Sequence, residues 1–100
     1  MQKDDWIYTL RSLAASKERL LILQYLGSQD TGVFSSTIAE KTGIKATTLS
    51  RMLRELEDAG FIHGDLAASE RRGRAVRYTL QPNRVRSTLR NAAASMHVTL

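Results

Sequence analysis

Short hydroxyl side chains and long cationic side chains occur together near the middle of the chain, and this combination could bind a polyanion. Thr47, Thr48 and Ser50 are small donors and acceptors that let a backbone come close to base edges. Arg51 and Arg54 follow and are long enough to reach bases or phosphates. The chemistry that these residues predict is hydrogen bonding and charge neutralisation on a nucleic acid, without bond making or breaking.

The same arginines also have a plainer interpretation. Arg51 lies four positions before Glu55, and Arg54 lies four positions before Asp58, which is the spacing of ion pairs on a solvated helix. This stretch alone does not decide between the two interpretations, so the rest of the chain must.

A second group of cations favours the nucleic-acid interpretation. Four arginines fall within seven positions, with Glu70 as their local acidic partner: Arg71, Arg72, Arg74 and Arg77. Beyond Glu70 the sequence holds seven arginines and no carboxylate, although the whole chain has a net charge of +5. Charge runs are usually solvated faces, but a run between two strands, directly after a pair of helices, lies where a phosphate backbone would pass.

Residues suited to catalysis or metal binding are not grouped in this sequence. There is no cysteine, and His63 and His97 stand apart from any Asp or Glu cluster at ligand spacing. The serines and threonines have no recognisable base and orienting acid. We therefore expect no enzymatic activity, no metal and no cofactor.

Apolar spacing and turn residues predict a mainly α-helical domain with a small β-hairpin (α+β). Helices are expected over residues 5–15, 16–27, 35–42, 46–59 and 83–97, and strands over 61–66 and 75–80. In the helix at 46–59, Leu49, Leu53 and Leu56 share one face, opposite Thr47, Arg51, Arg54 and Asp58. One face of that helix is core and the other is available for binding.

Residues at the helix ends refine this prediction. Leu20, Leu23 and Leu26 line one side of the helix at 16–27, which should be central to the core. Expected N-caps are Ser16, then Ser35 or Ser36, and finally Asn83 after a strand broken by Pro82. Gly43 supplies a tight turn between two helices. Lys45 leaves the amides at the start of the helix at 46–59 without a side-chain acceptor, which a phosphate could satisfy.

Length and composition limit the possibilities further. One hundred residues with 42% hydrophobic content predict a single domain over 1–100. Its longest apolar runs are far shorter than the roughly 20 residues that span a bilayer, and the N-terminus lacks an apolar signal core. We expect a cytoplasmic, nucleoid-associated protein without a membrane partner.

Three segments resemble the winged helix-turn-helix regulators, especially the ArsR family, which is named for the arsenical-resistance repressor. They are SKERLLILQYL, IAEKTGIKATTLSRMLRELEDAGFI and RRGRAVRYTL, and the likeness covers about residues 10–90. The resemblance implies five helices, a two-stranded wing, and a homodimer that places its recognition helices in successive major grooves of double-stranded DNA and represses transcription.

Carried onto this chain, the resemblance and the residue chemistry give two sets of site residues. The expected DNA-binding set is Ser36, Lys45, Thr47, Thr48, Ser50, Arg51, Arg54, Arg71, Arg72, Arg74 and Arg77. The helices at about 5–15 and 83–97 are expected to form the dimer interface through Trp6, Leu10, Val85, Leu89, Ala92 and Met96.

The chain departs from the metal-sensing members of that family. Those members carry cysteines near the start of the third helix, where this sequence has VFSSTIAE, with hydroxyls only. Another sensing arrangement uses His and carboxylates on the last helix, which here offers His97 and no acid. The resemblance therefore implies a sequence-specific, dimeric repressor, and these departures predict that it binds no metal. The alternatives are a winged-helix module that docks on another protein, and an architectural DNA binder without sequence preference.

Overall fold

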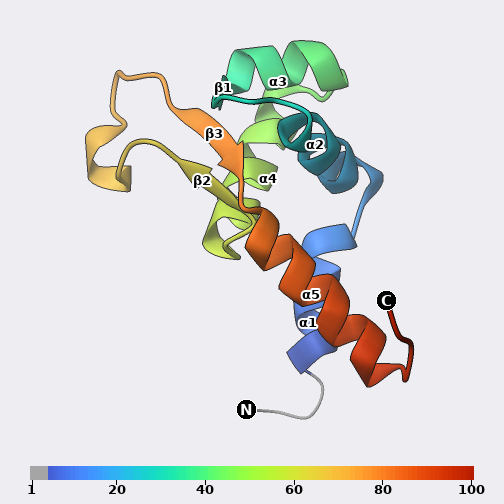
Figure 1. Cartoon of the computed structure of the whole chain (residues 1–100). Coiled ribbons are helices and arrows are strands. Elements are labelled where there is room, and N and C mark those ends of the chain that lie inside the picture. Colours follow the sequence, from blue (N-terminus) through green and yellow to red (C-terminus); the bar gives the residue numbers. More distant parts are fainter. Residues whose placement is uncertain (1–4) are drawn as a thin grey trace.

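A computed structural model describes residues 5–100 as five α-helices, three short strands and one turn of 3-10 helix (Figure 1). The elements in chain order are α1 (Asp5–Ala14), α2 (Lys17–Gly27), β1 (Val33–Phe34), α3 (Ser35–Thr42), α4 (Ala46–Asp58), β2 (Ile62–Gly64), η1 (Ala68–Glu70), β3 (Arg77–Leu80) and α5 (Pro82–Ser95). All five predicted helices are present, with ends that shift by at most two residues.

The helix starts agree with the sequence in two cases and differ in two. Ser16 caps α2, because its hydroxyl accepts a hydrogen bond from the Arg19 N–H, and Lys45 precedes α4 without a side-chain cap. The predicted caps of α3 and α5 were wrong. Phe34 is the N-cap residue of α3, so Ser35 and Ser36 already lie inside the helix. Gln81 is the N-cap residue of α5, because Pro82 can occupy a first helical position that needs no N–H donor.

The turn between α3 and α4 depends on a left-handed backbone. Gly43 has φ +76°, and its N–H donates to the Ala39 carbonyl oxygen at the end of α3. An L side chain disfavours this conformation, whereas glycine adopts it freely. The predicted role of Gly43 is confirmed, and the turn sets α4 across α3.

The sheet has three antiparallel strands in the order β1-β3-β2, so the prediction of a two-stranded hairpin was incomplete. Gly64 pairs with Tyr78 on one side of β3, and Val33 pairs with the same Tyr78 on the other side. The strands β2 and β3 are shorter than predicted, and residues 65–76 connect them. We call β2, β3 and the connecting residues 65–76 the wing.

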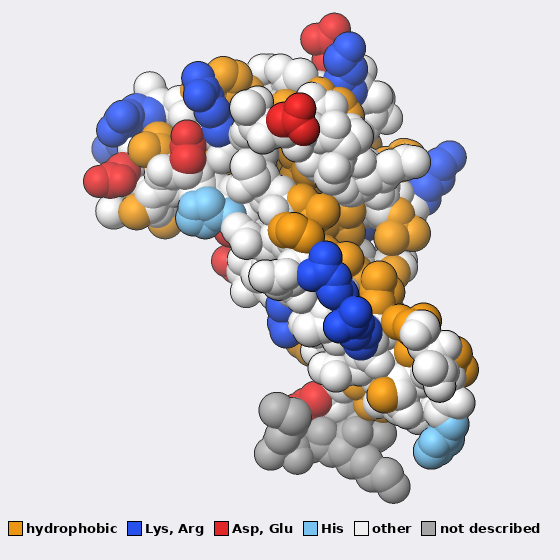
Figure 2. Space-filling view, in the orientation of Figure 1, with side chains coloured by type: hydrophobic (Ala, Val, Ile, Leu, Met, Phe, Trp, Pro, Cys, Tyr) orange, Lys and Arg blue, Asp and Glu red, His pale blue; other side chains and the backbone are white. Residues whose placement is uncertain are grey.

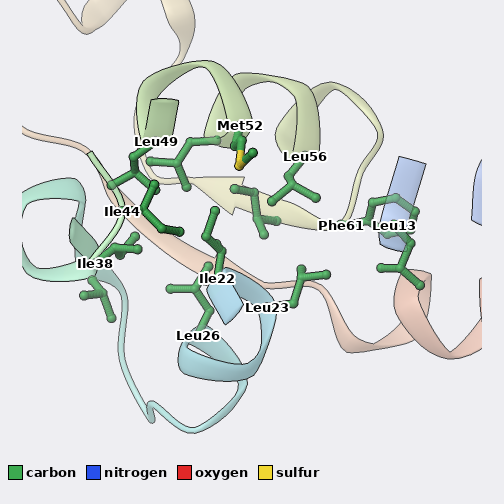
Figure 3. Close-up of a cluster of buried hydrophobic side chains, with 13 residues drawn as sticks. Leu13, Ile22, Leu23, Leu26, Ile38, Ile44, Leu49, Met52, Leu56 and Phe61 are labelled. Carbon is green, nitrogen blue, oxygen red and sulfur yellow. The ribbon is translucent and has the colours of Figure 1, made fainter. Parts of the chain in front are cut away.

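The core lies between α2 and α4 (Figure 3). Ile22, Leu23 and Leu26 of α2 face Leu49, Met52 and Leu56 of α4, and all six of these side chains are buried. The prediction that α2 is central is confirmed, but one of its residues was wrong. Leu20 is 49% exposed and Ile22 is fully buried, because α2 is rotated by part of a turn relative to the predicted core face.

The terminal helices α1 and α5 pack along each other and extend away from the sheet (Figure 1). We call this pair the stalk. It makes the molecule elongated, with extents of 46 × 27 × 24 Å. Within residues 5–100, no helix is both long and apolar enough to cross a bilayer.

Candidate nucleic-acid interface

One face of α4 forms a polar ridge, which we define as Thr47, Ser50, Arg51 and Arg54. All four side chains are exposed. Thr48 is half-buried at the edge of the ridge. The helical period places the ridge opposite the leucines, so the same spacing that builds the core also keeps these polar groups in solvent. The two-faced helix predicted from the sequence is confirmed.

The apolar face of α4 holds the ridge in place. Leu49, Met52, Leu53 and Leu56 are all buried, with exposures of 7% or less. Burying four side chains of this size contributes several kcal/mol, at about 1.5 to 3 kcal/mol each. The helix therefore cannot rotate the ridge inward without exposing its core face.

The arginines of the ridge are weakly engaged with the rest of the protein. The Arg51 Nε lies 3.9 Å from the Glu55 Oε1, and the Arg51 side chain is 61% exposed. Exposed pairs of this kind contribute about 0 to 1 kcal/mol. Arg54 forms no ion pair with any residue in the described range 5–100, so the pair with Asp58 that the plainer interpretation of the sequence allowed is absent there. Both guanidinium groups can turn toward a ligand at little cost.

Backbone donors add to the ridge. Neither α3 nor α4 has a side-chain hydrogen bond at its N-cap residue, Phe34 or Lys45. The first amides of each helix therefore have no side-chain acceptor, and the partial positive charge of a helix start favours an anion. Ser36 is exposed in the first turn of α3. Its hydroxyl and these amides suit a phosphate oxygen.

Sequence reasoning missed one cation beside the ridge. The exposed Lys17, in the first turn of α2, lines a shallow groove together with Lys45 and Thr48. The groove exists because α2 packs against α3 and lies close to the turn at Gly43. Lys17 carries no local signal in the sequence, since a lysine near a helix start is ordinary.

The tip of the wing presents a separate cationic surface, visible as blue side chains at the upper left of Figure 2. Arg72 and Arg74 are exposed and form no ion pair within residues 5–100. Gly73 between them has φ +71°, which lets the tip turn. These two residues keep the free guanidinium groups that the sequence predicted.

Arg71 behaves differently, contrary to the expectation from the sequence that it is a free cation. Its guanidinium returns to α4 and forms an ion pair with Glu57, with the Arg71 Nη2 2.7 Å from the Glu57 Oε2. The two side chains are only 26% and 24% exposed. The hydrogen bonds from Arg71 hold the pKa of Glu57 below its ordinary value, and Glu57 in turn raises the pKa of Arg71. Burial raises the pKa of the neighbouring Tyr78, against an opposing effect from Arg71.

Arg77 lies at the base of the wing. Its guanidinium carbon is 5.0 Å from the centre of the Phe34 ring, a cation–π arrangement that holds the side chain beside the start of α3. The Arg77 N–H donates to the Asp65 Oδ1. Arg77 is exposed. It therefore lies between the wing and the uncapped end of α3, apart from Arg72 and Arg74 at the tip.

The residues expected at a dimer interface divide into three groups. Leu89 and Met96 are 46% and 53% exposed on α5. Trp6, Leu10 and Val85 are half-buried. The expectation for Ala92 is corrected, because Ala92 is 3% exposed within this single chain and lies in the stalk where α5 packs on α1. A partner could contact Leu89 and Met96 but not Ala92.

Further apolar side chains are exposed on the stalk and beyond the end of α5. Ile7 of α1, and Val98 and Leu100 beyond α5, are 41%, 52% and 78% exposed. Figure 2 shows exposed apolar side chains along the stalk.

Among residues 5–100, no three His, Cys, Asp or Glu side chains come together as a metal site would require.

The helix-turn-helix formed by α3 and α4, followed by the wing, whose strands pair with β1 in a three-stranded sheet, defines the class of winged helix-turn-helix domains. Residues 14–65 match the family described as a helix-turn-helix domain, which is about half of the chain. The chain belongs to this helix-turn-helix domain family, whose fold is that of DNA-binding transcription regulators.

Solved structures share the fold over nearly the whole chain. An ArsR family transcriptional regulator has a TM-score of 0.73 at 16% identity, covering 96% of this chain and 91% of that one. A predicted DNA-binding transcriptional regulator from E. coli has a TM-score of 0.62 at 25% identity, covering 88% and 90%. The homodimeric winged helix-turn-helix domain of Mb0332 from Mycobacterium bovis has a TM-score of 0.64 at 21% identity, covering 97% and 90%. No protein of curated function matches the sequence.

Proposed function

We propose that this chain is a sequence-specific, dimeric DNA-binding repressor. The observation that carries the proposal is the polar ridge of α4, which is exposed and weakly paired and lies on the same domain as a wing tip with two free arginines. In this proposal the ridge enters the major groove and contacts base edges, while Arg72, Arg74 and Arg77 contact phosphates. The similarity to the predicted DNA-binding transcriptional regulator from E. coli supports the same function.

The proposed dimer uses the stalk. Leu89, Met96 and their exposed apolar neighbours would lose contact with water against a second copy, which is favourable at about 25 cal/mol per Å². The similar domain of Mb0332 is a homodimer. Two copies related by a two-fold axis would present two ridges to successive major grooves. The proposal includes a cytoplasmic location at the nucleoid, and it involves no catalysis, metal or cofactor.

A selection from random duplex DNA with the purified protein tests the proposal. The expected result is one enriched, two-fold symmetric sequence, bound at least about 10³-fold more tightly than random duplex, as specific regulators bind. Fluorescence polarisation with the enriched and scrambled duplexes measures this ratio. Equal affinity for both would contradict sequence-specific reading and would favour an architectural DNA binder.

Charge reversal distinguishes DNA binding from docking on another protein. Arg51→Glu combined with Arg72→Glu should abolish duplex binding and regulation in cells together. The matched control is Arg11→Glu, an exposed arginine on α1, far along the chain from both surfaces. If regulation in cells survived the loss of duplex binding, a protein partner would be the better explanation of these surfaces.

A further inference from the structure

The side chain of Arg71 connects three parts of the structure that are separate in sequence. The Arg71 Nη1 donates to the Glu57 Oε1 at 2.8 Å and the Arg71 Nη2 donates to the Glu57 Oε2 at 2.7 Å, so the contact with α4 is bidentate. The Arg71 Nε donates to the Leu66 carbonyl oxygen at 2.7 Å, within the wing connection. The guanidinium carbon also lies 6.0 Å from the centre of the Tyr78 ring of β3.

The backbone of β2 comes close to both side chains of this ion pair. The Gly64 N–H donates to the same Glu57 Oε2 at 3.0 Å, which ties β2 to α4 as well. A Cβ at position 64 would lie 2.5 Å from the Arg71 Nη2, 2.9 Å from the Glu57 Oε2 and 2.9 Å from the Val76 Cγ1. Position 64 therefore requires glycine so that the guanidinium and the carboxylate can approach the strand.

We propose that Glu57 and Arg71 are positioning residues for DNA binding, forming a latch that fastens the wing to α4 so that Arg72 and Arg74 stand at a set distance from the polar ridge. This inference rests on the function proposed above. It differs from the sequence-based expectation for Arg71, because Arg71 acts through the wing and makes no phosphate contact of its own.

The physical reason for such a latch is the length of the wing connection. Residues 65–76 contain one turn of 3-10 helix and otherwise no regular structure, and a free segment of this length would lose much conformational entropy on binding. The latch orders the connection before DNA arrives. It also neutralises Glu57, whose negative charge would otherwise repel a phosphate backbone from the wing side of α4.

The two possible roles of Arg71 predict opposite results for the same variants. If Arg71 contacted a phosphate, Arg71→Lys would keep the charge and most of the affinity, and Glu57→Gln would remove a repulsive charge and strengthen binding. If Arg71 is a latch residue, lysine cannot reproduce the bidentate contact, and glutamine removes its charged acceptor. Both variants should then weaken binding.

The test measures affinity by fluorescence polarisation for wild type, Glu57→Gln, Arg71→Lys and the double variant. The probe is the duplex recovered by selection, or a random-sequence duplex if none is enriched. We expect each single variant to bind about tenfold more weakly, the lower end of what charge-assisted hydrogen bonds contribute. The double variant should lose no more affinity than either single variant. In all three variants the affinity should fall with salt concentration along the wild-type slope. Stronger binding by Glu57→Gln, or a flatter salt slope for Arg71→Lys, would overturn the inference.

A second measurement needs no DNA and separates this inference from the proposed function. Backbone ¹⁵N relaxation of residues 65–76 should show increased motion in Glu57→Gln and in Arg71→Lys, while α4 keeps its wild-type order. Arg72→Ala is the matched control, since it removes a neighbouring exposed arginine and should leave wing motion unchanged. Unchanged wing motion in both latch variants would refute the latch even if the protein binds DNA as proposed.

Discussion

At the scale of single residues, the proposed recognition of a DNA sequence rests most directly on Arg51. The Arg51 side chain is exposed, and its contact with Glu55 is weak because the Arg51 Nε lies 3.9 Å from the Glu55 Oε1. It can therefore turn toward a base edge. We expect Arg51→Ala to weaken binding to the selected duplex by about 1 to 3 kcal/mol, the contribution of a bidentate contact to guanine. Polarisation titrations with the selected and scrambled duplexes check this. An equal loss on both duplexes would mean that Arg51 contacts the backbone.

The latch residue Glu57 gives a prediction about pH. Its pKa is lowered in the folded state, chiefly by the hydrogen bonds from Arg71, with smaller contributions from the Gly64 N–H and the nearby His63, while burial opposes the shift. The latch therefore stabilises the folded state at pH values above the ordinary glutamate pKa of about 4.3. This stabilisation is lost as the pH falls through the lower pKa of Glu57 in the folded state. Wild type should exceed Glu57→Gln by about 1 to 3 kcal/mol in free energy of unfolding at pH 7. Denaturation from pH 7 to 3 should show this difference shrinking, and a constant difference would contradict the assignment.

The sequence identified the residues of the ridge but not the fate of Arg71. Helical periodicity is a local signal, so Thr47, Arg51 and Arg54 could be placed on one exposed face. The partner of Arg71 is Glu57, on another element and fourteen positions away. Among adjacent arginines of the same charge, nothing local distinguishes the one that folds back. The core residue of α2 was misassigned for a similar reason: Leu20 was predicted to be buried, whereas Ile22 is. Residues 20–23, LLIL, are apolar at every position, so the pattern does not show which of them faces the core.

At the scale of elements, the wing should act on all duplexes alike. Arg72 is exposed at the wing tip and is expected to contact phosphates. Arg72→Ala should weaken binding to selected and scrambled duplexes by similar factors and reduce the salt slope by about one per protomer. Titrations at several salt concentrations measure the slope. A loss confined to the selected duplex would instead place Arg72 at a base edge.

The end of α5 offers a prediction about stability. His97 has φ +60°, and the Val98 N–H donates to the Ala93 carbonyl oxygen, so the chain reverses through a left-handed residue. Glycine takes this conformation without strain, and His97→Gly should raise the free energy of unfolding by about 0.5 kcal/mol. Ser95→Gly, inside the helix, is the control and should lower it by up to about 1 kcal/mol. Denaturation of both variants at one protein concentration measures these free energies of unfolding. A lower free energy of unfolding for His97→Gly than for wild type would contradict the strain argument.

The elements themselves were predicted with uneven success, for physical reasons. The helices have apolar spacing over about two to four turns each, and all five were found close to their predicted positions. The strand β1 has two residues, Val33 and Phe34, and so carries no period. Its pairing with Tyr78 and Arg77 joins positions far apart in the chain. The strands of the wing were predicted too long because apolar alternation continues beyond the last paired residue.

At the scale of the whole molecule, the stalk should hold two copies together. Leu89 is 46% exposed on α5 beside other exposed apolar residues. Leu89→Glu would place a charge in the proposed interface without a partner, which is costly. The variant should sediment as a monomer, whereas Asn91→Glu, an exposed neighbour on the same helix, should leave the dimer intact. A dimeric Leu89→Glu protein would remove this face of α5 from the interface.

The sequence could indicate the stalk helices but not which of their faces is free. Val85, Leu89, Ala92 and Met96 all belong to the apolar side of one helix. Which part of that side packs on α1 of the same chain depends on the contact between two helices separated by residues 15–81. In the structure Ala92 is buried, whereas Leu89 and Met96 stay exposed.

The junction between β3 and α5 is short and held in place. Gln81 alone separates the two elements, its N–H donates to the Phe61 carbonyl oxygen at 2.8 Å, and Pro82 follows with a restricted φ. In the proposed dimer this junction would fix the angle between each stalk and its DNA-binding domain, and so the distance between the two polar ridges. Such a dimer would tolerate little change in the spacing of the two half-sites along the DNA. Inserting about five base pairs, half a helical turn, between the half-sites would carry one of them to the opposite side of the duplex and out of reach.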